Sequence, residues 1–449
     1  MSSLPSDSNP AGGAPAALIH RRKAIAAAVL VGLAAMCALA GYELVRSSSN
    51  TLFRTAYGKQ RLAWIMAVTP AGVALMLYAY GRLLTWLGPR RTLLATTLGS
   101  AAIIAACYAA LRASWRPAAA VLFVVREAYI VLLIEQYWSF LNSTLGSDWA
   151  RKLNGPVCGV ASLGAIAGAS LVALLATRTG TAALLLIGAA STIPAAVLAH
   201  LAYRRCGEPA PERPARRTGA LALPLFRQHR VLVLLLAIIT LTQALSTCLD
   251  LSFQSRLHDA FASPDQQTSW SGAFFAWLNA CAAFMQFIVA PLALKLLPLP
   301  FVHLAIPLLN LAMCLWALLQ PSLRSAAAAF LAFKSLDYSL FRAAKELLYI
   351  PLPFDARYRA KEVIDVFAYR FGKGATSTAI AILHAAGRGL SDAALMGVAA
   401  ASAAIWGALA WPASRLPRAA ITCVMAGAAP APAPPSSCSS ANPSAGDRR

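Results

Sequence analysis

Long apolar runs separated by short polar segments are the feature that most limits how this chain can fold. A helix needs roughly 20 apolar residues to cross a hydrocarbon layer about 30 Å thick. Runs of about this length occur at 24–42, 62–80, 92–111, 118–141, 155–176, 182–203, 231–254, 271–294, 301–320, 325–350, 363–386 and 393–414. They predict an all-α membrane protein with 12 transmembrane helices in two bundles of six.

The segment between the sixth and seventh runs separates the two predicted bundles. It is rich in arginine and proline and contains no apolar run able to cross a membrane. We expect a flexible N-terminus at 1–23, a first bundle at 24–203, a basic linker at 204–230, a second bundle at 231–414 and a disordered tail at 415–449.

Two further patterns favour the major facilitator architecture, which is built from repeated helix bundles. The loop "GRLLTWLGPRR" (81–91) resembles the signature loop of that superfamily, with Thr85 in place of the usual aspartate. The segments 147–168 and 354–377 also resemble each other, because each has an aspartate, basic residues and then a helix rich in small residues. A duplicated six-helix unit predicts such a repeat.

The charge distribution predicts how the chain is oriented in the membrane. Only 12% of the residues are charged, yet the net charge is +22. The basic residues gather in alternate loops, which places both termini in the cytoplasm by the positive-inside rule. The exceptions follow the first run, namely Arg46, Arg54, Lys59 and Arg61, and these residues could face a cavity. We therefore expect a multi-pass protein of the cell (inner) membrane.

Several ionisable residues interrupt the apolar runs. Each costs roughly 2.5–3.5 kcal/mol at the bilayer centre on insertion scales, so it needs a partner, a cavity or the interface. Run 325–350 alone carries Lys334, Asp337, Arg342, Lys345 and Glu346, which share half the circumference of a continuous helix. With them, the candidate substrate-binding residues are Arg46, Glu127, Asp250, Arg370 and Lys373.

Other roles stay open for some of these candidates. Lys345 and Glu346 could extend to the membrane interface, and Glu127 could serve only in a salt bridge between helices. Basic candidates outnumber acidic ones, so a shared cavity would attract anions. Arginine can hold a phosphate or carboxylate with two hydrogen bonds, and lysine acts as a point charge.

The stretch "YSLFRAAKELLYIPLPFDARYRAKEVIDVF" (338–367) and the following "YRFGKGATS" (369–377) resemble a known transporter family. They are similar to the corresponding segments of the ATP/ADP translocase type of nucleotide transporter, found in plastids and obligate intracellular bacteria. The resemblance implies that Lys373, Arg370, Arg46 and Lys334 hold an anion. It also implies that Glu127 and Asp250 act as charge partners or coupling sites.

The chain departs from the family pattern at two places. The first-half motif, which resembles "LRDTKD" in the family, is "VRSSSN" (45–50) here, so Ser49 stands where the family has a lysine. The family motif "LGKSGG" has become "FGKGAT" (371–376). The lost lysine weakens the case for ATP/ADP exchange, although a diverged member could carry another anion.

The leading hypothesis is a monomeric secondary transporter that moves an anionic, nucleotide-like small molecule by alternating access. One alternative is a proton-coupled exporter of a siderophore, drug or other organic compound, with Glu127 or Asp250 carrying the proton. Another is a membrane scaffold that transports nothing. The dispersed histidines and cysteines favour neither an enzyme nor a metal site, and we expect no cofactor and no nucleic-acid partner.

Overall fold

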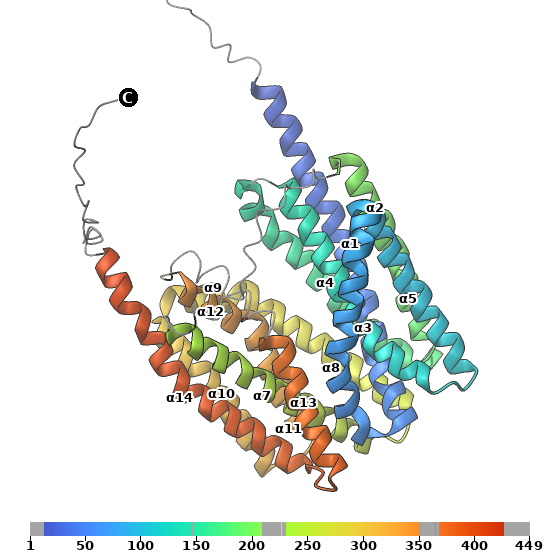
Figure 1. Cartoon of the computed structure of the whole chain (residues 1–449), viewed down its shortest axis with the longest axis vertical. Coiled ribbons are helices and arrows are strands. Elements are labelled where there is room, and N and C mark those ends of the chain that lie inside the picture. The colour runs from blue at the N-terminus through green and yellow to red at the C-terminus, as the bar shows by residue number, and fades with distance from the viewer. Residues whose placement is uncertain are drawn as a thin grey trace, which may run out of the picture.

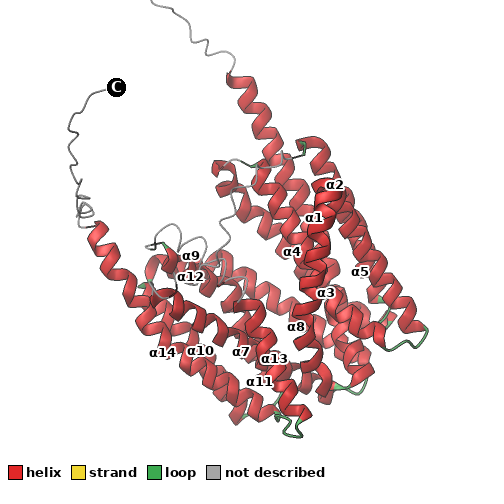
Figure 2. Ribbon diagram, in the orientation of Figure 1, coloured by secondary structure: helices red, strands yellow, loops and turns green. Residues whose placement is uncertain are grey.

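The computed structural model describes residues 13–145, 147–208, 230–350 and 368–425, together with 226, 352 and 364. Within these residues the chain is helical and has no strand (Figure 2). The all-α prediction is confirmed. Most of the predicted linker and the last part of the predicted tail lie outside the described residues.

The first half contains five α-helices and a short 3₁₀ turn. They are α1 (Gly13–Tyr57), η2 (Lys59–Arg61), α2 (Leu62–Arg112), α3 (Pro117–Thr144), α4 (Ser147–Thr179) and α5 (Leu184–Cys206). Helix α1 begins inside the segment expected to be a flexible N-terminus, where alanines favour helix. Helix α2 carries two of the predicted spans, which meet at a break where Gly88 adopts φ 72° and ψ 171°.

The second half contains eight α-helices and two π-helical turns within the described residues. They are α7 (Arg230–Ala260), α8 (Pro264–Phe284), η3 (Met285–Val289), α9 (Ala290–Leu296), α10 (Leu299–Leu319), α11 (Leu323–Leu336), η4 (Asp337–Phe341), α12 (Arg342–Tyr349), α13 (Tyr369–Ala385) and α14 (Asp392–Met425). The chain is helical throughout 323–349, but the expected uniform α-helical geometry over 325–350 is wrong, because residues 337–341 form the π-helical turn η4.

Nine helices within the described ranges are long and apolar enough to cross a membrane. Their outer surfaces carry large exposed apolar side chains, including Leu75, Leu163, Trp277 and Leu319. A water-soluble protein rarely exposes so much apolar surface, whereas a bilayer solvates it. The membrane assignment is confirmed, and the count of twelve spans stays a prediction.

Helix α1 is the centre of the first half. It packs against α3, α4 and α5 (Figure 1). Small residues of α4 allow the closest approach, because a Cβ atom on Gly164 or Gly168 would lie 2.1 Å from the Met36 carbonyl oxygen or 2.2 Å from that of Ala40. Close backbone packing of this kind is how helices associate in membranes.

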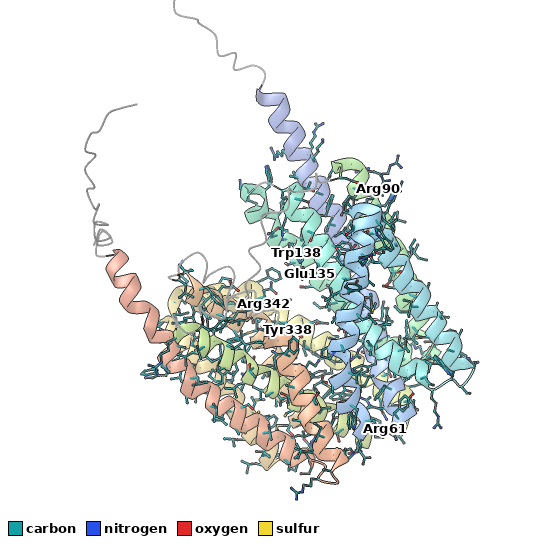
Figure 3. The ribbon with its side chains drawn as sticks, viewed as in Figure 1. Arg61, Arg90, Glu135, Trp138, Tyr338 and Arg342 are labelled. Atoms are coloured by element: carbon teal, nitrogen blue, oxygen red, sulfur yellow. The ribbon has the colours of Figure 1, made fainter. Side chains whose placement is uncertain are left out.

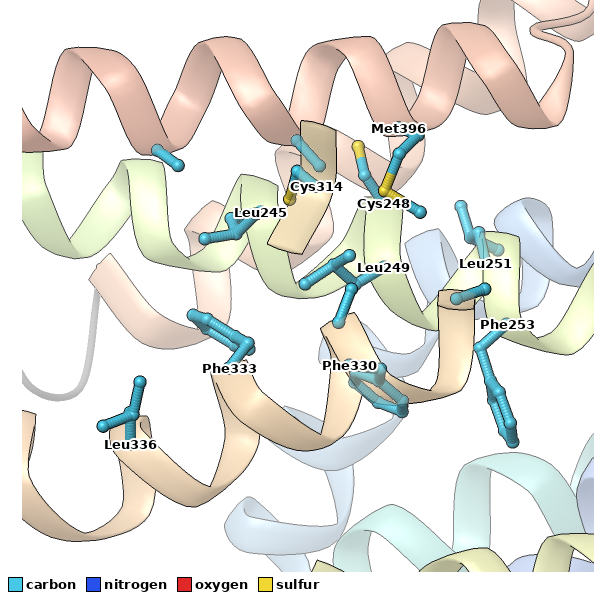
Figure 4. Packing of buried hydrophobic residues seen from close by; sticks show 14 of the residues in the cluster. Leu245, Cys248, Leu249, Leu251, Phe253, Cys314, Phe330, Phe333, Leu336 and Met396 are labelled. Carbon is cyan, nitrogen blue, oxygen red and sulfur yellow. The ribbon is translucent and has the colours of Figure 1, made fainter. Parts of the chain in front are cut away.

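The second half is organised around α7, which packs against α11, α13 and α14. Its side chains Leu245, Cys248 and Leu249 lie in one apolar cluster with Phe330 and Phe333 of α11 (Figure 4). This cluster fixes α11, and α11 carries Lys334 at its C-terminal end.

The two halves lie side by side and meet through three helix pairs (Figure 1). Helix α4 packs on α8, α1 on α8, and α2 on α13. In the last pair, a Cβ atom on Gly374 would lie 3.1 Å from Cγ of Pro70. The start of α1 and the end of α14 lie at the same end of the molecule (Figure 1).

We predict that Gly168→Leu destabilises the fold, because its side chain would overlap the α1 backbone. Overpacking of this kind costs about 1–3 kcal/mol, so the purified variant should unfold at a lower temperature than the wild type. Gly155→Leu is the control, since a Cβ atom at Gly155 meets nothing within 4 Å. Equal melting temperatures for the two variants would contradict this packing.

Candidate functional site

Charged side chains from both halves converge on Glu127 of α3. This carboxylate lies within electrostatic range of Lys373 on α13, Arg126 on α3, Arg46 on α1 and Lys334 on α11. Four cations from four helices therefore share one region between the halves. The structure thus brings together four of the residues proposed from the sequence, Arg46, Glu127, Lys334 and Lys373, with Arg126 as a fifth.

Arg126 is buried and held almost entirely by α1. Its Nη1 donates to the carbonyl oxygen of Arg46 at 2.9 Å, to Oγ of Ser49 at 2.9 Å and to Oδ1 of Asn50 at 2.6 Å. Its Nη2 lies 3.2 Å from Oε1 of Glu127, and its guanidinium carbon is 4.0 Å from the centroid of the Phe123 ring. Arg126 therefore ties α3 to α1 by charge-assisted hydrogen bonds.

Arg46 is paired within α1 and also contacts α8. Its Nη2 donates to Oε2 of Glu43, one turn earlier on the same helix. The other oxygen of Glu43 accepts a hydrogen bond from Nδ2 of Asn279 on α8 at 3.1 Å. The Arg46 guanidinium lies 3.5 Å from the centroid of the Phe275 ring, also on α8. Glu43 and Arg46 thus connect the first half to the second.

A pocket of about 180 Å³ lies beside this charge cluster. Glu127 and Lys373 supply its charged groups, and the remaining lining is formed mainly by apolar side chains of α2 and α3 and the Tyr369 ring of α13. Lys373 stands between Gly372, which packs near Gln243 of α7, and Gly374, which packs against Pro70. The two glycines allow α13 to lie close to both halves.

The π-helical turn η4 changes how the charges of run 325–350 are arranged. Asp337 is buried in this turn and Lys334 is half-buried, whereas Arg342 is exposed. The five charged residues therefore differ in exposure, and the π-helical turn shifts them from the positions that 100° per residue would give. Single π-turns inside helices are frequent at functional sites.

Lys334 and Lys345 both lie near aromatic rings. The Lys334 ammonium is 5.0 Å from the ring centroid of Tyr338, and the buried Lys345 ammonium is 5.4 Å from that of Tyr369. Lys345 is buried at 2% exposure, and its extension to a membrane interface stays a prediction. Glu346 is half-buried in α12.

The remaining candidates lie at the edges of the charge cluster. Asp250 accepts a hydrogen bond from Nε2 of Gln254 at 3.3 Å and lies within electrostatic range of Lys334. Arg342 is within electrostatic range of Asp337 and of Cys158 on α4. Cys158 belongs to the first half, so this interaction crosses the contact region between the two halves, here called the seam. Arg370 belongs to α13, but its side chain lies outside the described residues.

Polar contacts close the seam at the end opposite the termini. Arg54 of α1 is buried and donates to Gln254 of α7 and, at 3.1 Å, to Gln267 of α8. Lys59 contacts both carboxylate oxygens of Asp259, at 2.7 Å and 2.5 Å. These contacts explain two of the basic residues that departed from the positive-inside pattern, because Arg54 and Lys59 bind the other half.

Toward the other end, exposed side chains of the two halves lie on either side of a space between them. Figure 3 shows Glu135 and Trp138 of α3 on one side and Tyr338 and Arg342 on the other. Glu135, Tyr338 and Arg342 are exposed. The described conformation is therefore held closed by polar contacts at the end that carries Arg54.

A protein-family comparison locates the resemblance seen in the sequence. The family model described as "TLC ATP/ADP transporter" matches residues 318–411. These residues hold α11, η4, α12, α13 and most of α14. The resemblance to this family is confirmed. The matched segment includes Lys334 and Lys373, whereas Arg46 and Glu127 lie outside it.

Solved structures of membrane transporters share the fold. A mutant of the nucleoside transporter NupG superposes with a TM-score of 0.68 at 11% identity, covering 86% of this chain and 99% of that one. A bacterial homologue of the iron transporter ferroportin gives 0.63 at 16% identity, covering 87% and 98%. A D-xylose–proton symporter gives 0.59 at 13% identity, covering 87% and 98%. No curated protein sequence matches the chain.

These comparisons confirm the major facilitator fold and lead to transporters rather than to enzymes. The segment that matches the ATP/ADP transporter model supplies the second-half part of the charge cluster. The first half supplies the other part, through α1 and α3. The cluster therefore depends on residues that the family match alone does not cover.

The sequence alone did not single out Glu43, Asn279 or the buried role of Arg54. Glu43 could have been found, since an acid three residues before Arg46 in an apolar helix is the kind of signal that singled out Glu127. Asn279 gave no comparable signal, because an uncharged amide in an apolar run costs less. Its importance comes from the packing of α8 against α1.

We predict that Arg54→Leu loosens the closed end. Loss of hydrogen bonds to a charged group costs about 1.5–3 kcal/mol, which corresponds to roughly tenfold or more in an opening equilibrium. Amide hydrogen exchange at residues 57–62 and 260–264 should accelerate accordingly. Arg61→Leu is the control, because Arg61 is exposed at the same end (Figure 3). Unchanged exchange in Arg54→Leu would show that these contacts do not hold the end shut.

Proposed function

We propose that this protein is a secondary transporter that moves an anionic, nucleotide-like organic metabolite across a membrane by alternating access. The observation that carries the proposal is the convergence of Arg46, Arg126, Lys334 and Lys373 around Glu127, between two halves of a membrane-embedded fold. Cations are costly at this depth unless they are paired or face a wet cavity.

The position of the cluster supports a transport role. Transporters of this architecture place their substrate sites between the repeated bundles and expose them by rocking one bundle against the other. Here the cluster joins α1 and α3 of the first half to α11 and α13 of the second. A bound anion would be attracted by both halves at once and would favour their closure around it.

The two ends of the seam fit two stages of such a cycle. In the described conformation, Arg54 and Lys59 hold the halves together at one end. Opening that end requires these contacts to separate, while the end near the termini closes. We infer that both termini face the cytoplasm, that the bundles are 24–203 and 231–414, and that the transporter acts as a monomer in the cell inner membrane.

The alternatives have weaker support. A proton-coupled exporter needs an acid at the centre of its cycle that can take up and release a proton, yet Glu127 lies among four cations from four helices. A scaffold gives no reason to gather buried cations beside a pocket. The ATP/ADP transporter segment instead favours a phosphorylated guest.

We predict that Lys373→Met strongly reduces transport while leaving the fold intact. The purified protein would be reconstituted into liposomes loaded with unlabelled nucleotides, and uptake of radiolabelled nucleotides would be measured. Removing one charged contact to an anion costs about 1.5–3 kcal/mol, so uptake at low substrate concentration should fall at least about tenfold. Lys373→Arg should retain part of the activity, because it keeps the charge.

The matched control is Lys295→Met, which removes a lysine from the exposed surface of α9. Its uptake should equal that of the wild type. If no nucleotide enters the liposomes, or if Lys373→Met transports as well as Lys295→Met, the proposed function is wrong.

A further inference from the structure

We propose that the preferred guest carries about two negative charges, as a phosphomonoester does at neutral pH, and that Lys334 and Lys373 hold them. The guest would therefore be a phosphomonoester on a flat apolar group, such as a nucleoside monophosphate, rather than a diphosphate or triphosphate. This inference rests on the proposed function and specifies the class of its substrate.

Both arginines of the site already have partners. Arg46 is paired with Glu43, whose side chain is only 3% exposed. Arg126 gives its hydrogen bonds to α1 and to Glu127. A guest that took either guanidinium would have to displace a buried carboxylate or break the link between α3 and α1.

The surroundings of the two lysines differ from those of the two arginines. Among the described residues, neither Lys334 nor Lys373 has a carboxylate oxygen within 4.0 Å. Both nonetheless lie within electrostatic range of Glu127. They are therefore the cations of the cluster that a guest could reach without breaking an ion pair, and they come from the two helices α11 and α13.

Acidic residues limit how much negative charge the site tolerates. Glu127 lies within electrostatic range of both lysines, and Asp250 and Asp337 lie within electrostatic range of Lys334. A guest with three or four negative charges would place its additional charges against these carboxylates. Like charges brought together in a partly buried site cost several kcal/mol.

Ser49 stands at the position where the family that this sequence resembles has a lysine. Its side chain is fully buried, and its Oγ accepts a hydrogen bond from Arg126. Position 49 therefore contributes no cation to the cavity in this chain. A site with one cation fewer suits a guest with less charge.

The pocket beside Lys373 has a mainly apolar wall. Apart from the charged pair, its wall consists mainly of Met66, Pro70, Val73, Phe123 and Tyr369. Such a wall can cover an apolar or aromatic group by burial and ring contacts. A guest with its phosphate at the lysines and a flat ring against this wall satisfies both parts of the site.

The test is a competition series in the liposome assay, in which adenosine, AMP, ADP and ATP differ mainly in charge. Transport of labelled AMP should be inhibited by unlabelled AMP at concentrations at least about tenfold lower than by ATP or adenosine, the difference expected for one or two unfavourable charge contacts. Stronger inhibition by ADP or ATP would overturn this inference while leaving the proposed function in place. Absence of any nucleotide transport would overturn both.

A charge-altered variant tests the same point independently. Glu43→Gln leaves an acceptor for Asn279 but removes the carboxylate that neutralises Arg46, so the preference for ADP over AMP should rise about tenfold. Glu208→Gln is the control, since it removes an exposed acid outside the cluster, and its preference should equal that of the wild type.

Glu127→Gln serves as a second variant in case Glu43→Gln does not fold, because it also removes one acid from the cluster. It should shift the preference in the same direction. If the folded variants keep the wild-type ratio of ADP to AMP, the charge of the site does not select the guest and the inference fails.

Discussion

An ionised side chain remains inside a membrane-embedded bundle only where protein groups or water replace its hydration shell, and the centre of this structure follows from that requirement. Arg126 meets it through three acceptors on α1 and the neighbouring Glu127. Arg46 meets it through Glu43, and Arg54 through Gln254 and Gln267. Helix α1 therefore serves both as the packing centre of the first half and as the element that satisfies or supplies its buried charges.

The same requirement separates structural cations from those proposed to bind the guest. Arginine has five donors in a fixed plane and can link several acceptors, which suits the ties from α1 to α3, α7 and α8. Lys334 and Lys373 instead present compact charges on flexible stems, next to aromatic rings and an apolar pocket. The arginines would then keep the halves in register while the lysines respond to the substrate.

The sequence predicted much of the candidate site, but only its individual members. Lys334, Lys373 and Glu127 were found because charges in apolar runs are costly, and the ATP/ADP transporter resemblance singled out Lys373. The pairing of Glu43 with Arg46 was missed because Glu43 directly follows the first apolar run, 24–42, although residues three apart share a helix face. The π-helical turn at 337–341 was also missed, since a shift of hydrogen-bond register leaves no clear pattern in residue type.

The sequence by itself determined that the chain is an all-α membrane protein, because runs of about 20 apolar residues satisfy their own backbone hydrogen bonds as helices in lipid. It also determined the family resemblance over residues 318–411. Only the tertiary structure decided which charges meet, since contacts such as that between Asn279 and Glu43 join residues far apart in the chain. Pairing between charges on different helices depends on their distance and burial in space, and neither is encoded in the spacing of residues along one helix.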